Sequence, residues 1–467
     1  MKRIHLLTLL ILPSLLGYAQ EKYKVSYEEL KEYQGLYQYQ NNSTLHIAAS
    51  PKDTLLYAII NESRYQLMPF EKDLFLNMTK DRVEFFRDKQ NKVAGYTVGK
   101  DRFTILSRNV AFPKEMWYPR LTNPENYTYT YQRPTDDKDG LKVGSLENMD
   151  LDKSLLNEMM KKIVEGEYPN VHSVLILKND HLVFEEYFYE YNKQKLHELR
   201  SATKSFISAL TGIAIDKGLI KSKDETVLSY FTDYSIENNS DAKKRITIEN
   251  LLTNQSGLDC DISNPESVGN ETVMSNSDDW VRFILNLPMI DCAGGKGMYC
   301  SGNPILLGRI IEKTTQQTVP EFTKKNLFGP LGIKNWIWNF KPDKSSSETF
   351  CQVYLTPRDM VKFGLLYLNN GNWSGRQIIS KEWIDQSLKK HSVVQGVNYG
   401  YLWWNKYLDA DGVRYYSYAA QGNGGQKIYI FQELNMVIVI TGGNYNTQSP
   451  SDELIRKHIL PSFNKRH

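Results

Sequence analysis

The residues of this sequence best suited to chemistry are a serine and a lysine three positions apart, Ser201 and Lys204. Ser240, Ser387 and Ser462 also have a lysine three positions later, so the spacing alone is a weak signal. Ser201 differs from them because it directly precedes a stretch whose apolar residues recur at helical intervals and which ends at a glycine. Those apolar residues are Phe206, Ala209, Leu210, Ile213 and Ala214, and the glycine is Gly218.

This pattern predicts that Ser201 stands at the start of a buried helix, with Lys204 one turn further along the same face. Burial and the positive end of a helix both disfavour a charged lysine, so both lower its pKa. A neutral lysine can take the proton of a nearby hydroxyl, which makes the serine a nucleophile. The alternative is that Ser201 only caps the helix and Lys204 is solvated.

Two further segments contain residues that could complete a site. Residues 296–308 place Tyr299 and several small polar residues ahead of an apolar helical pattern. Residues 421–426 carry Gly422, Gly424 and Gly425 ahead of two strand patterns at 427–431 and 436–441. Glycines at such a place allow backbone N–H groups to approach a ligand closely.

In their order and spacing, the three segments resemble the penicillin-recognising serine hydrolases. This family includes class C β-lactamases, D-Ala-D-Ala carboxypeptidases, related esterases and 6-aminohexanoate-dimer hydrolases. Three more runs match the family, at 246–258, 327–333 and 356–360. The resemblance covers residues from about 150 to 460.

The resemblance implies a role for each of these residues. Ser201 would be the nucleophile, Lys204 its base, and Tyr299 a second acid–base group. The backbone N–H groups of Ser201 and Gly422 would form the oxyanion hole. The substrate would be contacted by Ser301, Asn303, Gly424 and Gly425.

One departure from the family bears on the substrate. Penicillin-binding members begin the last motif with Lys or His, then Ser or Thr, then Gly, and these residues engage the substrate's carboxylate. Here the equivalent stretch is Ala419-Ala420-Gln421, and Lys427 is another cation that could reach the pocket. A carboxylate-bearing substrate without such an anchor loses about 1.5–3 kcal/mol. We therefore expect an esterase or amidase. One alternative is a β-lactamase or D,D-carboxypeptidase, and another is a sensor that is acylated without efficient turnover.

The elements that must hold these residues indicate an α+β protein. Residues 33–107 form short alternating runs separated by turn residues, typical of a small all-β domain, either a barrel or a sandwich. The pattern resembles the lipocalin-like β-domain that is often attached to bacterial serine hydrolases. After it, a helix pattern at 151–165 and a hairpin pattern at 174–187 precede a mainly helical stretch. With the C-terminal strands, this predicts a β-lactamase-like or transpeptidase-like catalytic domain, an antiparallel sheet with a helical subdomain.

The N-terminus reads as a secretory signal peptide. Lys2 and Arg3 precede an apolar run, and Gly17 and Ala19 place small residues at a cleavage site. We expect a signal peptide at 1–19, an all-β domain at 20–110, a linker at 111–145 and the hydrolase domain at 146–467, in a periplasmic or secreted protein. The sequence contains no apolar run of the about 20 residues that a membrane span needs.

Other features of the sequence limit its ligands. The net charge of +3 argues against a nucleic-acid partner. No HExxH motif, dinucleotide fingerprint or phosphate-binding loop is present, so we expect no metal and no cofactor, and a small ester or amide as the substrate. Of the four cysteines, Cys260 and Cys292 are the favoured pair, and four free thiols are the alternative.

Overall fold

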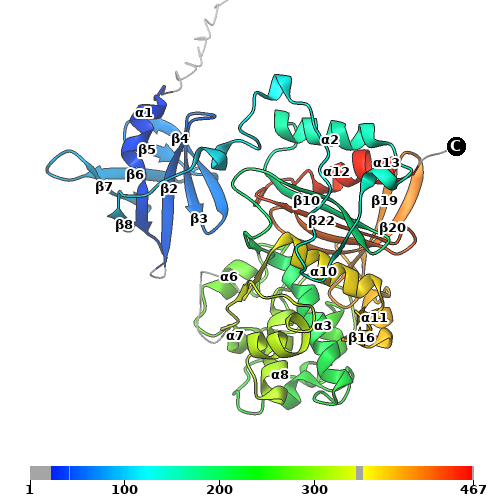
Figure 1. The fold of residues 1–467 in the computed structure, drawn as a ribbon. Helices are drawn as coiled ribbons and strands as arrows, with labels where there is room; N and C mark the ends of the chain where they lie inside the picture. Colours follow the sequence, from blue (N-terminus) through cyan, green and yellow to red (C-terminus); the bar gives the residue numbers. More distant parts are fainter. Residues whose placement is uncertain (1–22, 41–42, 343–350, 465–467) are drawn as a thin grey trace, which may run out of the picture. The chain divides into compact units, whose positions relative to one another are not determined.

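The computed structural model describes residues 23–40, 43–342 and 351–464, so the expected signal peptide at 1–19 lies outside the described residues. The chain divides into two compact units (Figure 1). The first takes in residues up to 38 with 46–58 and 65–110, and the second takes in 39–45, 59–64 and 111–467.

Eight strands of the N-terminal part close into a barrel in which β1 pairs with β8. Aromatic rings fill its interior, and the ring centroids of Tyr33 and Phe85 lie 4.7 Å apart in an edge-to-face contact. The barrel confirms the predicted small all-β domain, while a lipocalin-like relationship remains a prediction. The strands are β1 (Gly35–Gln38), β2 (Thr44–Ser50), β3 (Leu55–Ile60), β4 (Ser63–Glu71), β5 (Leu74–Leu76), β6 (Arg82–Arg87), β7 (Val93–Val98) and β8 (Asp101–Ser107).

The second unit is built on a nine-stranded sheet in the order β17-β18-β19-β20-β21-β22-β10-β11-β9. The pairs are antiparallel except for β9 and β11, which run parallel. The mixed α and β content agrees with the predicted α+β class. The strands are β9 (Lys142–Val143), β10 (Val171–Lys178), β11 (His181–Tyr187), β17 (Ser392–Val394), β18 (Val397–Tyr399), β19 (Trp404–Ala410), β20 (Val413–Gly422), β21 (Gln426–Phe431) and β22 (Met436–Gly442).

Helices cover both faces of this sheet (Figure 1). The helices near the ends of the unit lie on one face, namely α2 (Lys153–Glu165), α12 (Ser451–Leu454) and α13 (Leu460–Ser462). On the other face α10 (Pro357–Leu368) packs against β21 and β22. The contact is close at Gly364, where a Cβ atom would lie 2.6 Å from a side-chain carbon of Val437. Beyond α10 lies a helical region with α3 (Thr203–Asp216), α5 (Ile248–Leu252), α6 (Glu271–Ser275), α7 (Trp280–Asn286), α8 (Gly302–Thr315), α9 (Val319–Thr323) and α11 (Lys381–Leu388).

The segment expected as a linker, 111–145, belongs to the second unit and contacts its sheet and α10. The guanidinium of Arg358, which is buried in α10, lies 3.1 Å from a carboxylate oxygen of Asp137 and 3.0 Å from one of Asp139. Tyr131 donates a hydrogen bond of 2.8 Å to the carbonyl of Val183 in β11. Residues 131–139 are therefore part of the framework that holds α10 against the sheet.

Within the described ranges, no helix is long and apolar enough to cross a membrane. The same residues contain no group of three or more His, Cys, Asp or Glu side chains arranged to hold a metal ion.

Candidate active site

The serine and lysine singled out by their spacing are in direct contact. The side-chain nitrogen of Lys204 donates a 2.8 Å hydrogen bond to Oγ of Ser201. Ser201 lies in the 3-10 turn Arg200–Ala202 that leads into α3, and Lys204 is 6% exposed. The helix has Ala202 at its N-cap with no side-chain cap, so Ser201 is not a capping residue and Lys204 is not solvated. The alternative that the sequence left open is therefore wrong on both points.

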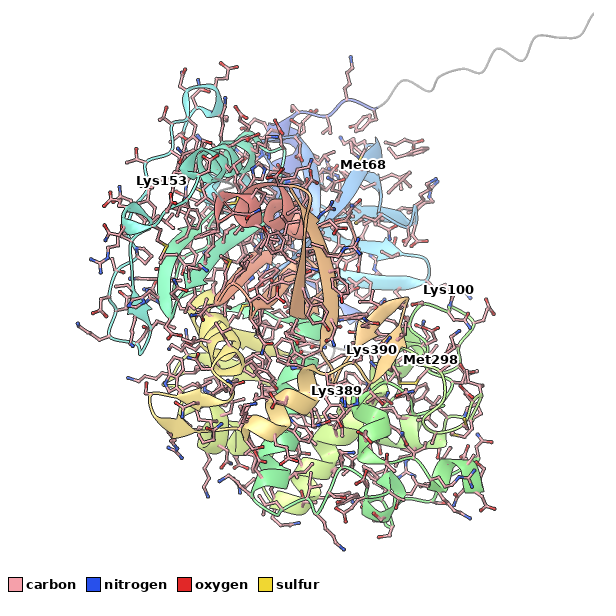
Figure 2. All side chains as sticks on the ribbon, turned by 90° about the vertical axis from the view of Figure 1, so that its right-hand side faces the viewer. Met68, Lys100, Lys153, Met298, Lys389 and Lys390 are labelled. Carbon is pink, nitrogen blue, oxygen red and sulfur yellow. A yellow bond between two sulfur atoms is a disulfide. The ribbon has the colours of Figure 1, made fainter. Side chains whose placement is uncertain are left out.

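The ring of Tyr299 lies next to the side-chain nitrogen of Lys204. The Lys204 nitrogen lies 5.1 Å from the centre of the Tyr299 ring, and the ring is held 5.3 Å from that of Trp404 in β19. The backbone carbonyl of Tyr299 accepts a hydrogen bond of 3.1 Å from Ile262. The backbone N–H of Met298, one residue earlier and labelled in Figure 2, donates a 2.8 Å hydrogen bond to the carbonyl of Asn254. The segment that carries the tyrosine is thus fixed from two directions.

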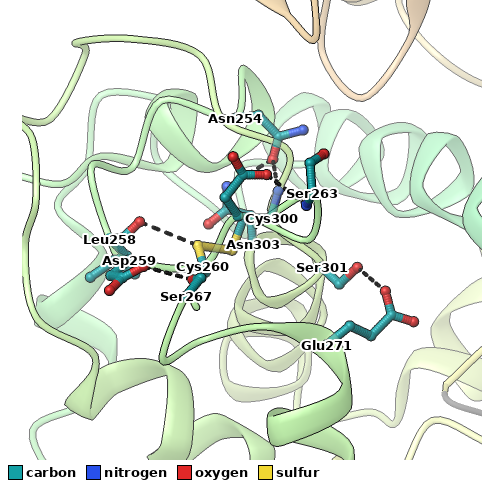
Figure 3. Close-up of a disulfide and its surroundings, with 11 residues drawn as sticks. Asn254, Leu258, Asp259, Cys260, Ser263, Ser267, Glu271, Cys300, Ser301 and Asn303 are labelled. Carbon is teal, nitrogen blue, oxygen red and sulfur yellow. Dashed lines mark hydrogen bonds between the residues drawn. A yellow bond between two sulfur atoms is a disulfide. The ribbon is translucent and has the colours of Figure 1, made fainter. Parts of the chain in front are cut away.

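A disulfide fixes the same segment, but with a partner other than the expected one. Cys260 is bonded to Cys300, and their Cα atoms are 5.2 Å apart (Figure 3). The prediction of a Cys260–Cys292 bridge was wrong, because Cys292 is exposed on the loop before this segment while Cys300 points inward. Cys292 and Cys351 are both free thiols, the first exposed and the second buried.

The two polar residues after Tyr299 have different surroundings. Asn303 is fully buried, and its side-chain amide donates a 2.9 Å hydrogen bond to Oδ1 of Asn254 (Figure 3). Ser301 instead donates a 2.7 Å hydrogen bond to Oε2 of Glu271 and lines a pocket together with Lys204. Of these two predicted substrate contacts, the structure brings only Ser301 to the pocket, whereas Asn303 ties α8 to the residues after α5.

The pocket beside Lys204 is a small cavity of about 30 Å³. Its walls come from α3, α6, α8 and the stretches around 340 and 351. Glu271 is the functional candidate that sequence reasoning missed, because it lies on a five-residue helix, 30 positions before the serine that it contacts. The lining residues are Thr203, Lys204, Ile207, Glu271, Met274, Ser301, Pro304, Ile305, Phe340, Cys351 and Gln352.

The glycine segment reaches the nucleophile from the sheet. Strand β20 ends at Gly422, where a Cβ atom would lie 2.2 Å from the carbonyl oxygen of Leu199. Only glycine therefore allows the strand to pass this close to the turn that carries Ser201. Gly424 and Gly425 have φ values of +92° and +100°, so their role in the structure is to form the left-handed turn that leads into β21.

Residues 419–421, which stand where penicillin-binding relatives carry a cation, begin with two buried alanines. Ala419 and Ala420 are 0% and 1% exposed, and neither presents a polar side chain. Lys427 lies opposite Gln421 on β21, and its nitrogen is 2.8 Å from Oε1 of Gln421 and 3.4 Å from Asp452 in α12. Because side chains alternate along a strand, Lys427 faces α12, whereas Gly422 faces Leu199. Burial lowers the pKa of Lys427, and Asp452 opposes this effect.

Glu198, three residues before Ser201, is a buried carboxyl group. Its carboxylate lies 3.1 Å from the guanidinium of Arg200 and is 1% exposed. Burial raises the pKa of Glu198 to about 7, although Arg200 acts in the opposite direction.

Comparison with known proteins agrees with this geometry. Residues 156–458 match the family model described as Beta-lactamase. "Beta-lactamase-like protein 2" of Dictyostelium discoideum is 25% identical over 216 residues, which are 44% of this chain and 36% of that protein. The chain thus spans little more than a third of that relative's length.

Two solved structures show the same fold. A penicillin-binding protein homologue from Pyrococcus abyssi, described as octameric, aligns with a TM-score of 0.53 and 18% identity over 66% of this chain and 76% of its own. A family VIII carboxylesterase aligns with a TM-score of 0.53 and 13% identity over 66% of this chain and 96% of its own. The sheet with its helical region is therefore the β-lactamase-like, transpeptidase-like fold that the sequence predicts.

Proposed function

This chain belongs to the β-lactamase family, and on that premise we propose that it is an exported serine hydrolase that cleaves an ester or an amide through an acyl-enzyme on Ser201. The observation that carries the proposal is the 2.8 Å hydrogen bond from the buried Lys204 to Oγ of the partly buried Ser201. A serine hydroxyl becomes a nucleophile when an adjacent base can take its proton.

The surrounding residues supply the other steps. Ser201 Oγ attacks the carbonyl carbon while its proton passes to Lys204 or Tyr299. The backbone N–H groups of Ser201 and Gly422 stabilise the oxyanion, and each such donor contributes about 10²–10³ in rate. Tyr299 or Lys204 then protonates the leaving group, which departs, and one of them activates the water that hydrolyses the acyl-enzyme.

An esterase or amidase fits this site better than a β-lactamase or a D,D-carboxypeptidase. The substrates of the latter two carry a carboxylate, and residues 419–421 offer it neither a cation nor a hydroxyl. Lys427, the nearby cation on β21, is bonded to Gln421 and Asp452 instead.

Turnover of a substrate panel tests the proposal. Purified protein is assayed with p-nitrophenyl esters, short amides, nitrocefin and D-Ala-D-Ala. We expect hydrolysis of an uncharged ester or amide, and a fall of at least about 10³-fold in kcat for Ser201→Ala. Ser240→Ala is the matched control, since Ser240 also has a lysine three residues later but caps α4 (Asp241–Lys244).

Three outcomes would contradict parts of the proposal. Undiminished turnover by Ser201→Ala would remove the nucleophile assignment. Efficient hydrolysis of nitrocefin would favour the β-lactamase alternative. Covalent labelling of Ser201 without turnover of any substrate would indicate a penicillin-binding-like sensor.

A further inference from the structure

The residue directly before the proposed nucleophile has an unusual backbone conformation. Arg200 has a φ of +48°, in the left-handed region that side chains other than glycine rarely adopt. Glycine would take this conformation without a steric cost, so an arginine at this position is held against its local preference. Residues of this kind persist where the surrounding structure fixes them, and they cluster at functional sites.

The guanidinium of Arg200 is held by three buried groups of the second unit. Its Nε lies 3.1 Å from Oε1 of Glu198, and its Nη2 donates a hydrogen bond of 3.0 Å to Oγ of Ser63. Its Cζ atom lies 5.1 Å from the centre of the Tyr445 ring, within the range of a cation–π contact. Because Glu198, Ser63 and Tyr445 are all buried, each contact is made to a side chain that packing already fixes.

These groups come from segments that are far apart in the chain. Glu198 lies in β12 (His197–Glu198), which pairs with β14 (Val353–Leu355). Its backbone N–H donates a hydrogen bond of 3.3 Å to Oε2 of Glu62, next to Ser63. Tyr445 follows the last strand of the sheet. The side chain of Arg200 therefore ties the turn that carries the nucleophile to several separate parts of the unit.

The conformation of Arg200 bears directly on the oxyanion hole. The peptide bond between Arg200 and Ser201 is planar and carries the N–H group of Ser201, so the backbone of Arg200 sets the direction of that N–H. The other proposed donor is close by, since a Cβ atom on Gly422 would lie 3.0 Å from Cβ of Arg200. Donors of an oxyanion hole are effective only when they are already aimed at the place where the charge develops.

We propose that Arg200 is a positioning residue of this hydrolase, whose guanidinium holds the left-handed turn in which the N–H of Ser201 points at the oxyanion. The inference rests on the proposed acyl-enzyme function. It adds a residue that neither attacks the substrate nor transfers a proton. Loss of the guanidinium should therefore weaken the stabilisation of the tetrahedral states.

Two substitutions of Arg200 test the role of the backbone conformation. Both remove the guanidinium, but Arg200→Ala keeps a Cβ atom that disfavours the left-handed turn, whereas Arg200→Gly does not. With a p-nitrophenyl ester, we expect kcat/KM of Arg200→Ala to fall about ten- to hundredfold. Arg200→Gly should be at least about threefold faster than Arg200→Ala, because glycine adopts the turn without strain.

An inhibitor that mimics the tetrahedral intermediate gives a second measurement. The boron atom of phenylboronic acid accepts an electron pair from Oγ of Ser201 while the Oγ proton passes to the base. The adduct has a tetrahedral, negatively charged boron, and one of its hydroxyl groups takes the place of the oxyanion. The inhibition constant should rise in Arg200→Ala by about the factor by which kcat/KM falls. A loss of folded protein alone would leave the inhibition constant unchanged.

Two further variants complete the experiment. Arg309→Ala is the matched control, because the side chain of Arg309 is 19% exposed against 22% for Arg200 and is paired with Glu312 at 2.8 Å, but lies in α8. Its kcat/KM and inhibition constant should match those of the wild type. Ser63→Ala removes one contact and keeps the guanidinium, so it is the milder test should Arg200→Ala fail to fold. We expect both quantities to change in the same direction as in Arg200→Ala, and by less.

The outcomes separate this inference from the function on which it rests. Wild-type values of both quantities in Arg200→Ala would overturn the inference. Equal losses in Arg200→Ala and Arg200→Gly would also overturn it, because the guanidinium would then act on the substrate and not on the turn. If Arg200→Ala does not fold, wild-type values in Ser63→Ala decide against it. Absence of hydrolysis by the wild type would instead contradict the proposed function.

Discussion

The disulfide between Cys260 and Cys300 should stabilise the protein and hold its site in place. It closes a loop of 40 residues. In the chain-entropy account such a loop reduces the entropy of the unfolded chain enough to stabilise the fold by about 4 kcal/mol at 25 °C. Replacing both cysteines with alanine should lower the free energy of unfolding by about that amount.

The same replacement should slow catalysis, because the bridge ends between two residues of the site. Cys300 directly follows Tyr299 and directly precedes Ser301. Without the bridge, this segment keeps the hydrogen bond from Ile262 to the carbonyl of Tyr299 but loses its covalent link to the loop at 260. Small displacements of reacting groups cost up to about a hundredfold in rate, so we expect kcat to fall by about tenfold to a hundredfold.

Unfolding in denaturant and ester hydrolysis, each with and without a reductant, measure both effects. The matched controls are Cys292→Ala and Cys351→Ala, since neither thiol is bridged. Reduction should shift the unfolding midpoint of the wild type and of Cys292→Ala, and should leave the Cys260→Ala/Cys300→Ala protein unchanged. The reasoning fails if the reductant has no effect on the wild type, or if Cys292→Ala removes the effect.

Two further predictions concern buried charges. Asp139→Asn should lower the free energy of unfolding by about 2 kcal/mol, because it takes a charged partner from the buried guanidinium of Arg358. Unfolding in urea measures this loss. An equal loss in the exposed control Asp136→Asn would contradict the prediction. For Glu198, the pKa of about 7 in the folded protein against 4.5 for an ordinary glutamate means that the folded state keeps a proton that the unfolded state has lost. The free energy of unfolding should therefore fall by about 3 kcal/mol as pH rises from 4.5 to 7. Glu198→Gln should abolish this dependence on pH. A variant with the same pH dependence as the wild type would refute its assignment to Glu198.

The sequence predicted those parts of the site that depend on local order. The apolar periodicity after Ser201 identified a buried helix, and a lysine three residues into such a helix must lie near the serine. The C-terminal strands and the short strands of the N-terminal β-domain could be anticipated for the same reason, since alternation and turn residues are local signals. The closure of those short strands into a barrel pairs β1 with β8, which alternation does not indicate.

The remaining features depend on which distant segments meet. Glu271 and Ser301 are 30 positions apart in a loop-rich region, and no periodicity connects them. The pairing of Cys260 with Cys300 depends on how that region folds back on itself, which cysteine spacing cannot give. The burial of Asn303 against Asn254, 49 positions away, is equally invisible in the sequence.

The sheet of the second unit also sets the order in which the site can form during synthesis. Its neighbouring strands β10 and β22 come from opposite ends of the unit, and Oγ of Ser173 lies 2.6 Å from Oγ1 of Thr441, 268 positions later in the chain. Contacts of such long range form slowly, because a long loop must close before they can contribute. The serine and lysine leave the ribosome more than 200 residues before Gly422 does, so the nascent chain carries its nucleophile long before the strand that borders it. Activity should therefore appear only after the last strands have been made and docked.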